Sequence, residues 1–409
     1  MIKRFSSVTL IVLSLSVGAI LADGPQCRGW VGLWRLAPVA QGQGVAVHIK
    51  ISEQDGRCRV FQFDSDFTRV VEGQNVTITP QKLSYQSPPE ATNFTVSLER
   101  TGDSAQGETR LLHPQFRATF ARTAHRVTKD GDWDPVESVK AQADELGLAN
   151  LAETLVDHAP TSSLEELEKY WNSQIEPHYY SAVQEIIYGE SGGIKERRKN
   201  LARLLTLLKD DSFVKHVRLL TAKHEEVVRK IRETAPDLFY PNVFLMLPAF
   251  GAFDVSVETM GKTVLVRVAV DSKALSESKD PGGWLIREHL KLPLYRMFSP
   301  GDPGVVASLV LNGLAGYWAV SRGFVADPFD CLLTPISEHP ASSSKEQRLQ
   351  MMGAIRRLLP AADVNEEALT LVGFDFAKRL TSTFSMQEIL AMEKVKVGEH
   401  LWSFLQSQP

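Results

Sequence analysis

Charged and imidazole side chains are concentrated in one five-residue window, Arg287 to Lys291, which reads Arg-Glu-His-Leu-Lys. A carboxylate can act as a general base, and an imidazole can bind a metal ion or transfer a proton. Around this window apolar residues recur three to four positions apart, which predicts a helix packed on a core. A second stretch of this kind, which contains Asn312, follows a Pro/Gly turn. We therefore expect two neighbouring buried helices to hold these side chains.

The window has the layout of the zinc-binding motif His-Glu-x-x-His. In that motif two histidines one turn apart bind zinc, the glutamate activates a water, and the next helix supplies a third ligand. Here Arg287 and Lys291 stand at the histidine positions and Asn312 at the third position. Glu288 alone keeps its type, as a vestigial catalytic residue. Because Arg and Lys offer no lone pair and repel a divalent ion, the sequence predicts a site without zinc.

The same letters also fit an ordinary exposed helix face. Glu288 and Lys291 would then form a surface ion pair worth about 0.3 kcal/mol, and His289 would be a structural histidine. If Glu288 is instead enclosed, its charge must be matched, and Arg287 or Lys291 is the nearest basic group. For that case we predict an internal salt bridge in place of a metal ion.

Strand-like segments precede the window. Residues 240–271 contain two or three strands with a turn at Gly261, and Gly251-Ala252-Phe253-Asp254 lies among them. Downstream, residues 312–317 read Asn-Gly-Leu-Ala-Gly-Tyr and end at Tyr317. The order of these elements can be compared with that of known proteins.

This order resembles the gluzincin-like exported zinc metallopeptidases. In them a strand pair with Gly-x-Phe-Asp precedes the metal helix, and the next helix carries Glu-Gly-Leu-Ala-x-Tyr, whose glutamate is a zinc ligand. The resemblance covers about residues 240–325, where several short matches occur in the right order. It implies a mostly helical domain with a short sheet, and a cleft near His289 and Tyr317. The chain departs from the family at all three metal positions, so peptidase activity is not implied.

Overall composition excludes one class of partner. The 409 residues carry 45 Lys and Arg against 49 Asp and Glu, a net charge of −4. No basic cluster with interleaved aromatic residues occurs, so nucleic acid is not an expected partner. The first 22 residues read as an export signal, with Lys3 and Arg4 before an apolar run and cleavage after Ala22; an uncleaved anchor is the alternative. No later segment is long and apolar enough to span a bilayer, so we expect a periplasmic or secreted protein.

Three cysteines fit an oxidising compartment. Cys27 and Cys58 fall in the same small region, and a disulfide between them is plausible there; two buried thiols are the alternative. Cys331 has no catalytic context and is interpreted as a packed residue.

The chain is expected to have an α+β fold with two parts. Residues 23–127 alternate polar and apolar residues between turns, which predicts a small antiparallel β barrel or sandwich with an accessory or binding role. Gly32-Leu33-Trp34 resembles the opening of calycin-type barrels, whose Trp plugs the bottom, and we expect side chains to fill the interior. Residues 128–135 are a predicted linker, and residues 136–409 form the mostly helical, metallopeptidase-like domain.

Within the helical part, Ser163 and Glu166 predict a capping box, and residues 386–406 predict one last helix. His216 and His224 have no acidic partner at ligand spacing and are interpreted as surface or interface residues.

Three functions are consistent with the sequence. The first is a non-catalytic homologue that serves as a binding or scaffold protein, with Arg287 and Lys291 facing an anionic ligand such as a peptide carboxylate. The second is an active metal-dependent hydrolase with atypical ligands, His289 together with His339 or His400. In the third, the β domain binds the ligand and the helical part is a structural partner. No cofactor is expected in the first case.

Overall fold

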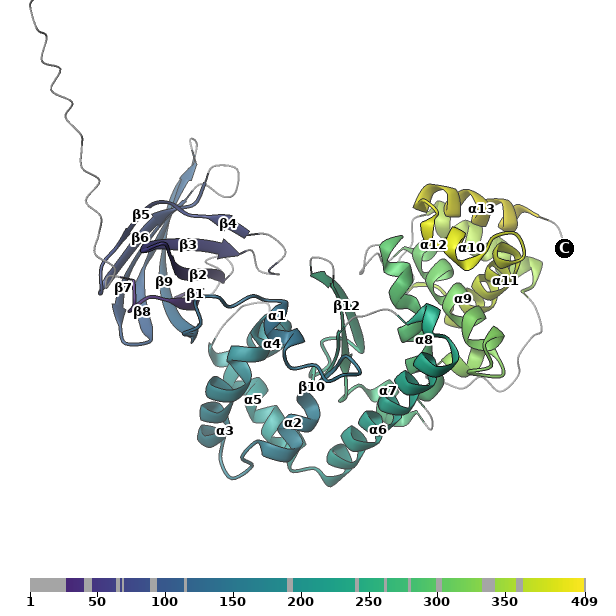
Figure 1. The fold of residues 1–409 in the computed structure, drawn as a ribbon, viewed down its shortest axis with the longest axis horizontal. Helices are drawn as coiled ribbons and strands as arrows, with labels where there is room; N and C mark the ends of the chain where they lie inside the picture. The colour runs from purple at the N-terminus through teal and green to yellow at the C-terminus, as the bar shows by residue number, and fades with distance from the viewer. Residues whose placement is uncertain are drawn as a thin grey trace, which may run out of the picture.

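The fold is α+β. A nine-stranded antiparallel sheet, nearly closed into a barrel, precedes a mostly helical region with a second, small sheet (Figure 1). The expected fold class is therefore confirmed. The structure is a computed structural model that describes residues 27–39, 46–63, 67, 70–88, 94–113, 116–189, 194–239, 243–260, 263–278, 281–298, 304–332, 343–357 and 363–407. The expected export signal, residues 1–22, lies outside these. Among the described helices, none has the length and apolar character that a bilayer span requires.

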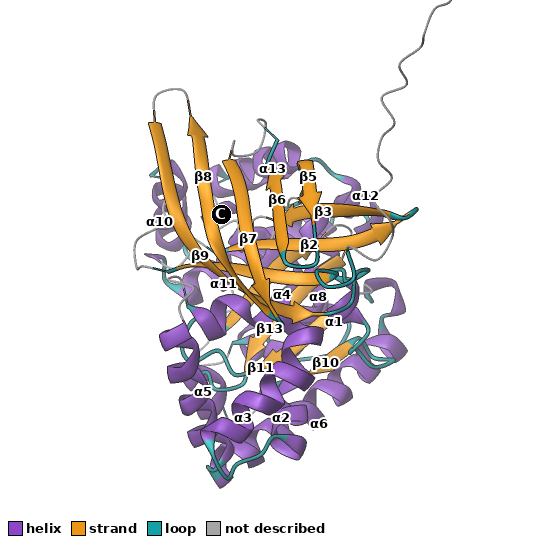
Figure 2. Ribbon diagram, turned by 90° about the vertical axis from the view of Figure 1, so that its left-hand side faces the viewer, coloured by secondary structure: helices purple, strands orange, loops and turns teal. Residues whose placement is uncertain are grey.

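The sheet order of the barrel strands is β4-β3-β2-β1-β9-β8-β7-β6-β5. Near the ends of this order the sheet folds back on itself: the Gly73 amide donates to the Val60 carbonyl (2.8 Å), and the Tyr85 hydroxyl donates to Gln62 (3.1 Å). Figure 2 shows β7, β8 and β9 as the long strands of this sheet. The strands are β1 (Gly32–Pro38), β2 (Val47–Gln54), β3 (Arg57–Phe63), β4 (Val70–Glu72), β5 (Gln74–Ile78), β6 (Lys82–Gln86), β7 (Phe94–Thr101), β8 (Ser104–His113) and β9 (Phe116–Thr128).

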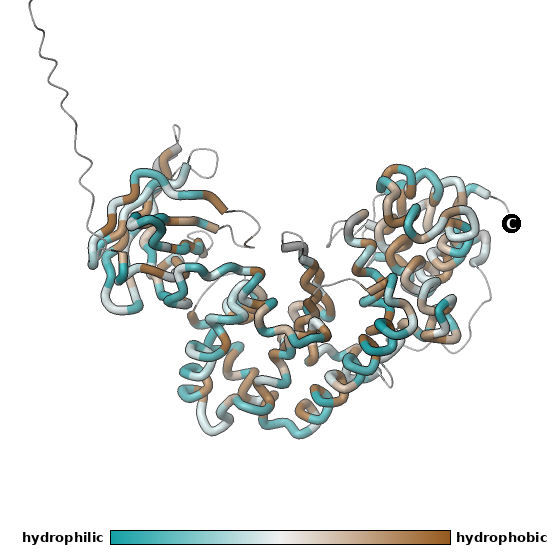
Figure 3. The backbone as a smooth tube through the Cα atoms, viewed as in Figure 1, coloured by the Kyte–Doolittle hydropathy of each residue, from teal (hydrophilic) through white to brown (hydrophobic). Residues whose placement is uncertain are grey.

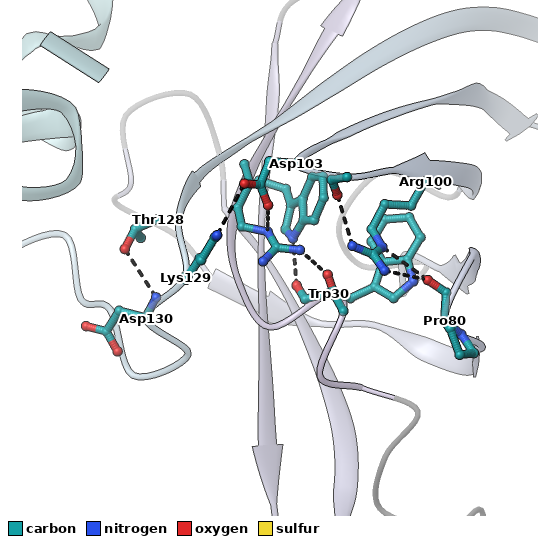
Figure 4. A network of polar contacts seen from close by, with 11 residues as sticks. Trp30, Pro80, Arg100, Asp103, Thr128, Lys129 and Asp130 are labelled. Carbon is teal, nitrogen blue, oxygen red and sulfur yellow. Dashed lines mark hydrogen bonds and ion pairs between the residues drawn. The ribbon is translucent and has the colours of Figure 1, made fainter. Parts of the chain in front are cut away.

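Side chains fill the barrel interior, as expected. Trp34 is fully buried, and its indole N–H donates to the Trp30 carbonyl (2.6 Å). Trp30 donates in turn to the Thr79 carbonyl (2.8 Å). Beside Trp30, Arg100 donates to the Pro80 carbonyl, so that the end of the barrel is tied together by a polar network (Figure 4). Cys27 and Cys58 form a disulfide in this part of the chain.

The helical region contains three groups of elements. Before the second sheet come α1 (Glu137–Lys140), β10 (Leu148–Asn150), α2 (Leu151–His158), α3 (Leu164–Tyr170), the π-helical turn Trp171–Ile175, α4 (Glu176–Tyr188), α5 (Ile194–Leu208), α6 (Asp211–Thr234) and a 3₁₀ turn Pro236–Leu238. The second sheet contains β10 together with β11 (Val243–Leu247), β12 (Val255–Met260) and β13 (Thr263–Ala269). Then follow α7 (Lys273–Glu277), α8 (Gly282–Lys291), a 3₁₀ turn Leu292–Arg296, α9 (Val305–Ser321), a 3₁₀ turn Pro328–Cys331, α10 (Lys345–Arg356), α11 (Glu366–Thr381), α12 (Met386–Ala391) and α13 (Lys394–Gln406).

Local signals account for several helix boundaries. The Ser163 hydroxyl accepts from the Glu166 amide at the start of α3, as the predicted cap requires. The single helix predicted for residues 386–406 is wrong, because the chain is extended at Met392 and Glu393 and forms α12 and α13 instead.

The second sheet has the order β10-β11-β13-β12, in which β10, β11 and β13 are parallel and β12 is antiparallel. Its strand β11 is buried on both faces. Phe244 and Met246 face a core shared with α6, α8, α9 and α11, whereas Val243 and Leu245 face a core shared with α3 to α5 and the barrel. Figure 3 shows this sheet among the most hydrophobic parts of the trace. The sheet thus separates the two main cores.

The core on the barrel side is continuous with the outer face of the barrel. Leu33, Phe63 and Val127 belong to it. In the predicted linker, Trp133 is buried against Phe63, with an edge-to-face ring contact at 6.2 Å between centroids, and donates to the Pro177 carbonyl at the start of α4 (3.2 Å). Residues 128–135 are therefore anchored to both the barrel and the helices.

Candidate functional site

The α8 helix places the charged window inside the protein. Helix α8 packs against α6, α9 and the 3₁₀ turn Pro328–Cys331. Its start lies so close to this turn that a Cβ on Gly283 would come within 2.1 Å of the Asp330 carbonyl oxygen, which only glycine allows. Arg287, Glu288 and Lys291 are buried, with exposed fractions of 5%, 5% and 9%. The alternative of a solvated helix face is wrong for these three side chains.

Glu288 is matched by both neighbouring cations. Its Oε1 atom lies 2.7 Å from Lys291 Nζ and 3.3 Å from Arg287 Nε. Burial acts to raise the pKa of the Glu288 carboxyl, but attraction to Lys291 and then Arg287 outweighs it, so that the pKa lies below its usual value. The predicted internal salt bridge is confirmed. That it replaces an ancestral metal ion stays a prediction.

Asn312 and Tyr317, on the neighbouring helix α9, are less closely tied to this ion pair. Both are half-buried, and Tyr317 packs on Phe374 with ring centroids 5.9 Å apart. No hydrogen bond within the described part of the chain joins Asn312 to Glu288. The structure thus brings three of the four predicted site positions into direct contact.

Two further groups lie near the ion pair. The 3₁₀ turn carries Cys331, which is fully buried, as the sequence predicted. Burial raises the pKa of its thiol to about 12, so the thiol stays protonated and is a poor nucleophile. Burial, followed by the charge of Glu288, also raises the pKa of Tyr295. Neither group adds reactivity to the site at neutral pH.

His289 points to a partner that sequence reasoning missed. Its Nε2 atom lies 2.9 Å from Nε2 of His224 on α6, and its ring stacks on Phe244 with centroids 4.0 Å apart. The interpretation of His224 as a surface or interface residue is wrong, because its exposed fraction is 0%. The missed signal is its spacing: His224 lies four positions from both Leu220 and Val228, on the buried face of α6.

Both rings of this pair are neutral near pH 7. Burial lowers the pKa of His224 to about 4, with a smaller opposing effect of Asp144. Burial and the neighbouring His224 hold the pKa of His289 well below its usual value. One imidazole therefore donates to the other, in the manner of a structural hydrogen bond.

The other expected ligands do not join His289. His400 is exposed on α13 beside Phe384, with ring centroids 5.1 Å apart, and His339 lies outside the described residues. Across the described ranges, no three side chains among His, Cys, Asp and Glu are grouped so that they could hold a metal ion.

The Gly251–Asp254 segment has a structural role. The Asp271 carboxylate accepts from the Ala249 amide (2.6 Å) and the Phe250 amide (2.7 Å), which fixes the turn after β11. Asp254 accepts from the Ser272 hydroxyl (2.6 Å). These bonds join the ends of β11 and β13 on the way to α8.

Comparison with known proteins gives no match: no protein-family model, curated protein or solved structure is similar to this chain. Function is therefore inferred from the arrangement of the side chains.

Proposed function

We propose that the protein is a non-catalytic binding or scaffold protein, related to zinc metallopeptidases, in which an internal ion pair replaces the metal. The observation that carries this proposal is the state of Glu288. A general base must reach a water molecule and have a pKa near the working pH. Glu288 is 5% exposed, its Oε1 contacts two cations, and its pKa is lowered. It is therefore placed as a structural anion.

The ion pair bears on what the protein could bind. Arg287 and Lys291 both contact Glu288, so an anionic ligand such as a peptide carboxylate would have to displace a buried partner. This favours a scaffold role for α8 over anion capture at this position. The Cys27–Cys58 disulfide supports the proposed location in the periplasm or outside the cell, because disulfides persist in oxidising compartments.

A metal-dependent hydrolase with atypical ligands is the alternative, and the His224–His289 pair favours it. Two neutral imidazoles face each other at 2.9 Å and could supply two ligand nitrogens. A catalytic zinc site takes about three protein ligands and an open position, so this reading needs one further ligand.

Metal binding and peptide hydrolysis of the purified protein test the proposal. We expect no cleavage of a quenched peptide library with or without added zinc, and no stoichiometric zinc by elemental analysis. His289→Gln is compared with His400→Gln, which changes an exposed histidine on α13. Stoichiometric zinc that is lost in His289→Gln and kept in His400→Gln would establish the alternative. Cleavage that disappears in Glu288→Gln while the variant stays folded would also overturn the proposal.

A further inference from the structure

A polar row crosses the outer face of the barrel where the helices cover it. Arg35 of β1 is paired with His48 of β2 and with His125 of β9, so the three side chains lie on one face of the sheet. Arg35 is fully buried and His48 is 1% exposed. Buried polar groups in such a row need partners, and these come from the helix that packs on them.

The facing side of α4 carries a matching stripe. Glu176, Tyr180 and Tyr188 are four and eight positions apart, which places them along one side of the helix. All three are buried. These three polar side chains, spaced one and then two turns apart on α4, therefore face the row formed by Arg35, His48 and His125 on the barrel.

Specific contacts join the row to the stripe. His48 Nε2 lies 2.9 Å from the Tyr180 hydroxyl, and His125 Nε2 lies 3.2 Å from the Tyr188 hydroxyl. The Tyr188 hydroxyl donates to Glu176. Because the Tyr188 proton is used in that bond, the Tyr188 oxygen accepts from His125, whose Nε2 carries the hydrogen. The neutral His125 ring thus has its second nitrogen, Nδ1, available for a proton.

Positive charge surrounds this ring. The Arg35 guanidinium lies 3.9 Å from the centroid of the Tyr188 ring, and Arg197 Nε of α5 lies 3.9 Å from Glu176 Oε1. On the β8 side, Asp103 precedes Ser104, the cross-strand partner of His125, and already pairs with Arg126 and Lys129. By element, the titratable and charged groups that these contacts bring to the interface are Arg35 (β1), His48 (β2), Asp103 (the β7–β8 turn), Glu176, Tyr180 and Tyr188 (α4), and Arg197 (α5).

We infer that this group is an acid-sensitive latch between the barrel and the helical region. Uptake of one solvent proton at His125 Nδ1 adds a third cation to Arg35 and Arg197 at this interface, where Glu176 contacts Arg197 and Tyr188. The repulsion weakens the contact of β1, β2 and β9 with α4, and the barrel separates from α4 while each part keeps its secondary structure.

Ionisation of the groups supports the latch. Burial, with Arg35 and then Arg197, lowers the pKa of His125 to about 3. A released His125 regains an ordinary pKa of about 6.5 and binds a proton that the docked state excludes, so acid favours release between these two values. Glu176 acts in the opposite direction, because burial raises its pKa and the docked state binds its proton more readily.

The size of the expected acid effect follows from the pKa of His125 in the docked and in the released state. Between pH 7 and pH 5, His125 shifts the release equilibrium by at most about 25-fold, and Glu176 reduces this factor. Removal of the Glu176 carboxylate should therefore make the acid response larger, whereas a side chain at position 125 that cannot be charged should abolish it.

Limited proteolysis and solution scattering test the latch. The segment 128–135 connects the two parts, and its Trp133 is buried between Phe63 and Pro177 while the barrel is docked. For the wild-type chain, we expect faster cleavage in this segment and a larger radius of gyration at pH 5 than at pH 7, with unchanged far-UV circular dichroism. In His125→Gln, whose amide can still donate to Tyr188, we expect less than about a twofold change, since no proton is taken up.

Two further variants make the result decisive. Glu176→Gln should show a steeper acid response than the wild type, and His400→Gln should match the wild type. Equal cleavage of the wild type at both pH values, or an acid response of His125→Gln as large as that of the wild type, would overturn the latch. Should His125→Gln fail to fold, Glu176→Gln decides alone: an acid response no larger than that of the wild type would also overturn it.

Discussion

The buried histidine pair makes stability depend on pH in a way that one substitution can isolate. His224 has a folded-state pKa of about 4 against about 6.5 when unfolded, so the unfolded chain binds the proton first as the pH falls. Stability from this ring is complete above pH 6.5 and is lost as the pH falls towards 4. Between pH 7 and pH 5 the loss is about 2 kcal/mol, and His289 adds to it in the same direction.

Urea unfolding at pH 7 and pH 5 measures this difference. The variant His224→Gln keeps a polar partner for His289 Nε2 but does not titrate. Its unfolding free energy should fall less than that of the wild type by about 2 kcal/mol over this interval. The control His400→Gln changes an exposed ring on α13 and should follow the wild type. An equal pH dependence of His224→Gln and the wild type would refute the argument that burial sets the charge state of this pair.

Three other substitutions probe packing and charge. Lys291→Met removes the closest partner of the buried Glu288 carboxylate and should lower the unfolding free energy by about 3 kcal/mol in urea titrations. Gly313→Ala should cost about 3 kcal/mol or more, because the new Cβ would lie 2.2 Å from the Gly373 carbonyl oxygen, and thermal unfolding followed by circular dichroism reports this loss. Cys27→Ser opens a disulfide that spans 31 residues and should cost about 3 to 4 kcal/mol, measured against the oxidised wild-type chain.

The first two of these have matched control variants. Lys82→Met breaks an exposed ion pair with Glu99 and should leave the urea midpoint unchanged, which separates burial from charge loss as such. Gly398→Ala on α13 places a Cβ where no atom lies within 4 Å, and should not destabilise. Equal midpoints for Lys291→Met and the wild type would contradict the enclosure of Glu288. A stable Gly313→Ala would contradict the close contact of α9 with α11. Identical stability of Cys27→Ser and the oxidised wild type would show that the disulfide does not constrain the unfolded chain.

Local sequence patterns were enough to predict much of the fold. Barrel strands alternate polar and apolar residues, and most pair with neighbours in sequence, so their existence and these antiparallel pairs are readable; the pair of β1 with β9 joins distant segments. Strand β10 is different. It has three residues, Leu148–Asn150, and its partner β11 begins at Val243, so neither its length nor its surroundings indicate a parallel pair. The sequence did not indicate which distant segments are in contact.

At the candidate site, too, some features could be predicted from the sequence and others could not. The Arg287–Lys291 window and the matched charge of Glu288 followed from residue spacing on one helix and from the cost of burying a lone charge. The spacing on α6 could have shown that His224 is buried, but its partner His289 could not be read from the sequence because it is on another helix. Arg35 was missed for a related reason: β1 is covered on both faces, and a buried arginine in it becomes intelligible only once α4 is in place.

The core that joins the barrel to the helices can be completed only late in translation, because it contains residues from distant parts of the chain. Leu33 and Phe63 pack in the same core as Leu245 and Leu265, which leave the ribosome much later. The early strands can form hydrogen bonds as they emerge, but the cover on the outer face of β1 to β3 begins with α4 and is complete only when the second sheet has been made. Until then the nascent chain exposes an apolar surface, and a holding chaperone that shields it should raise the yield of native protein.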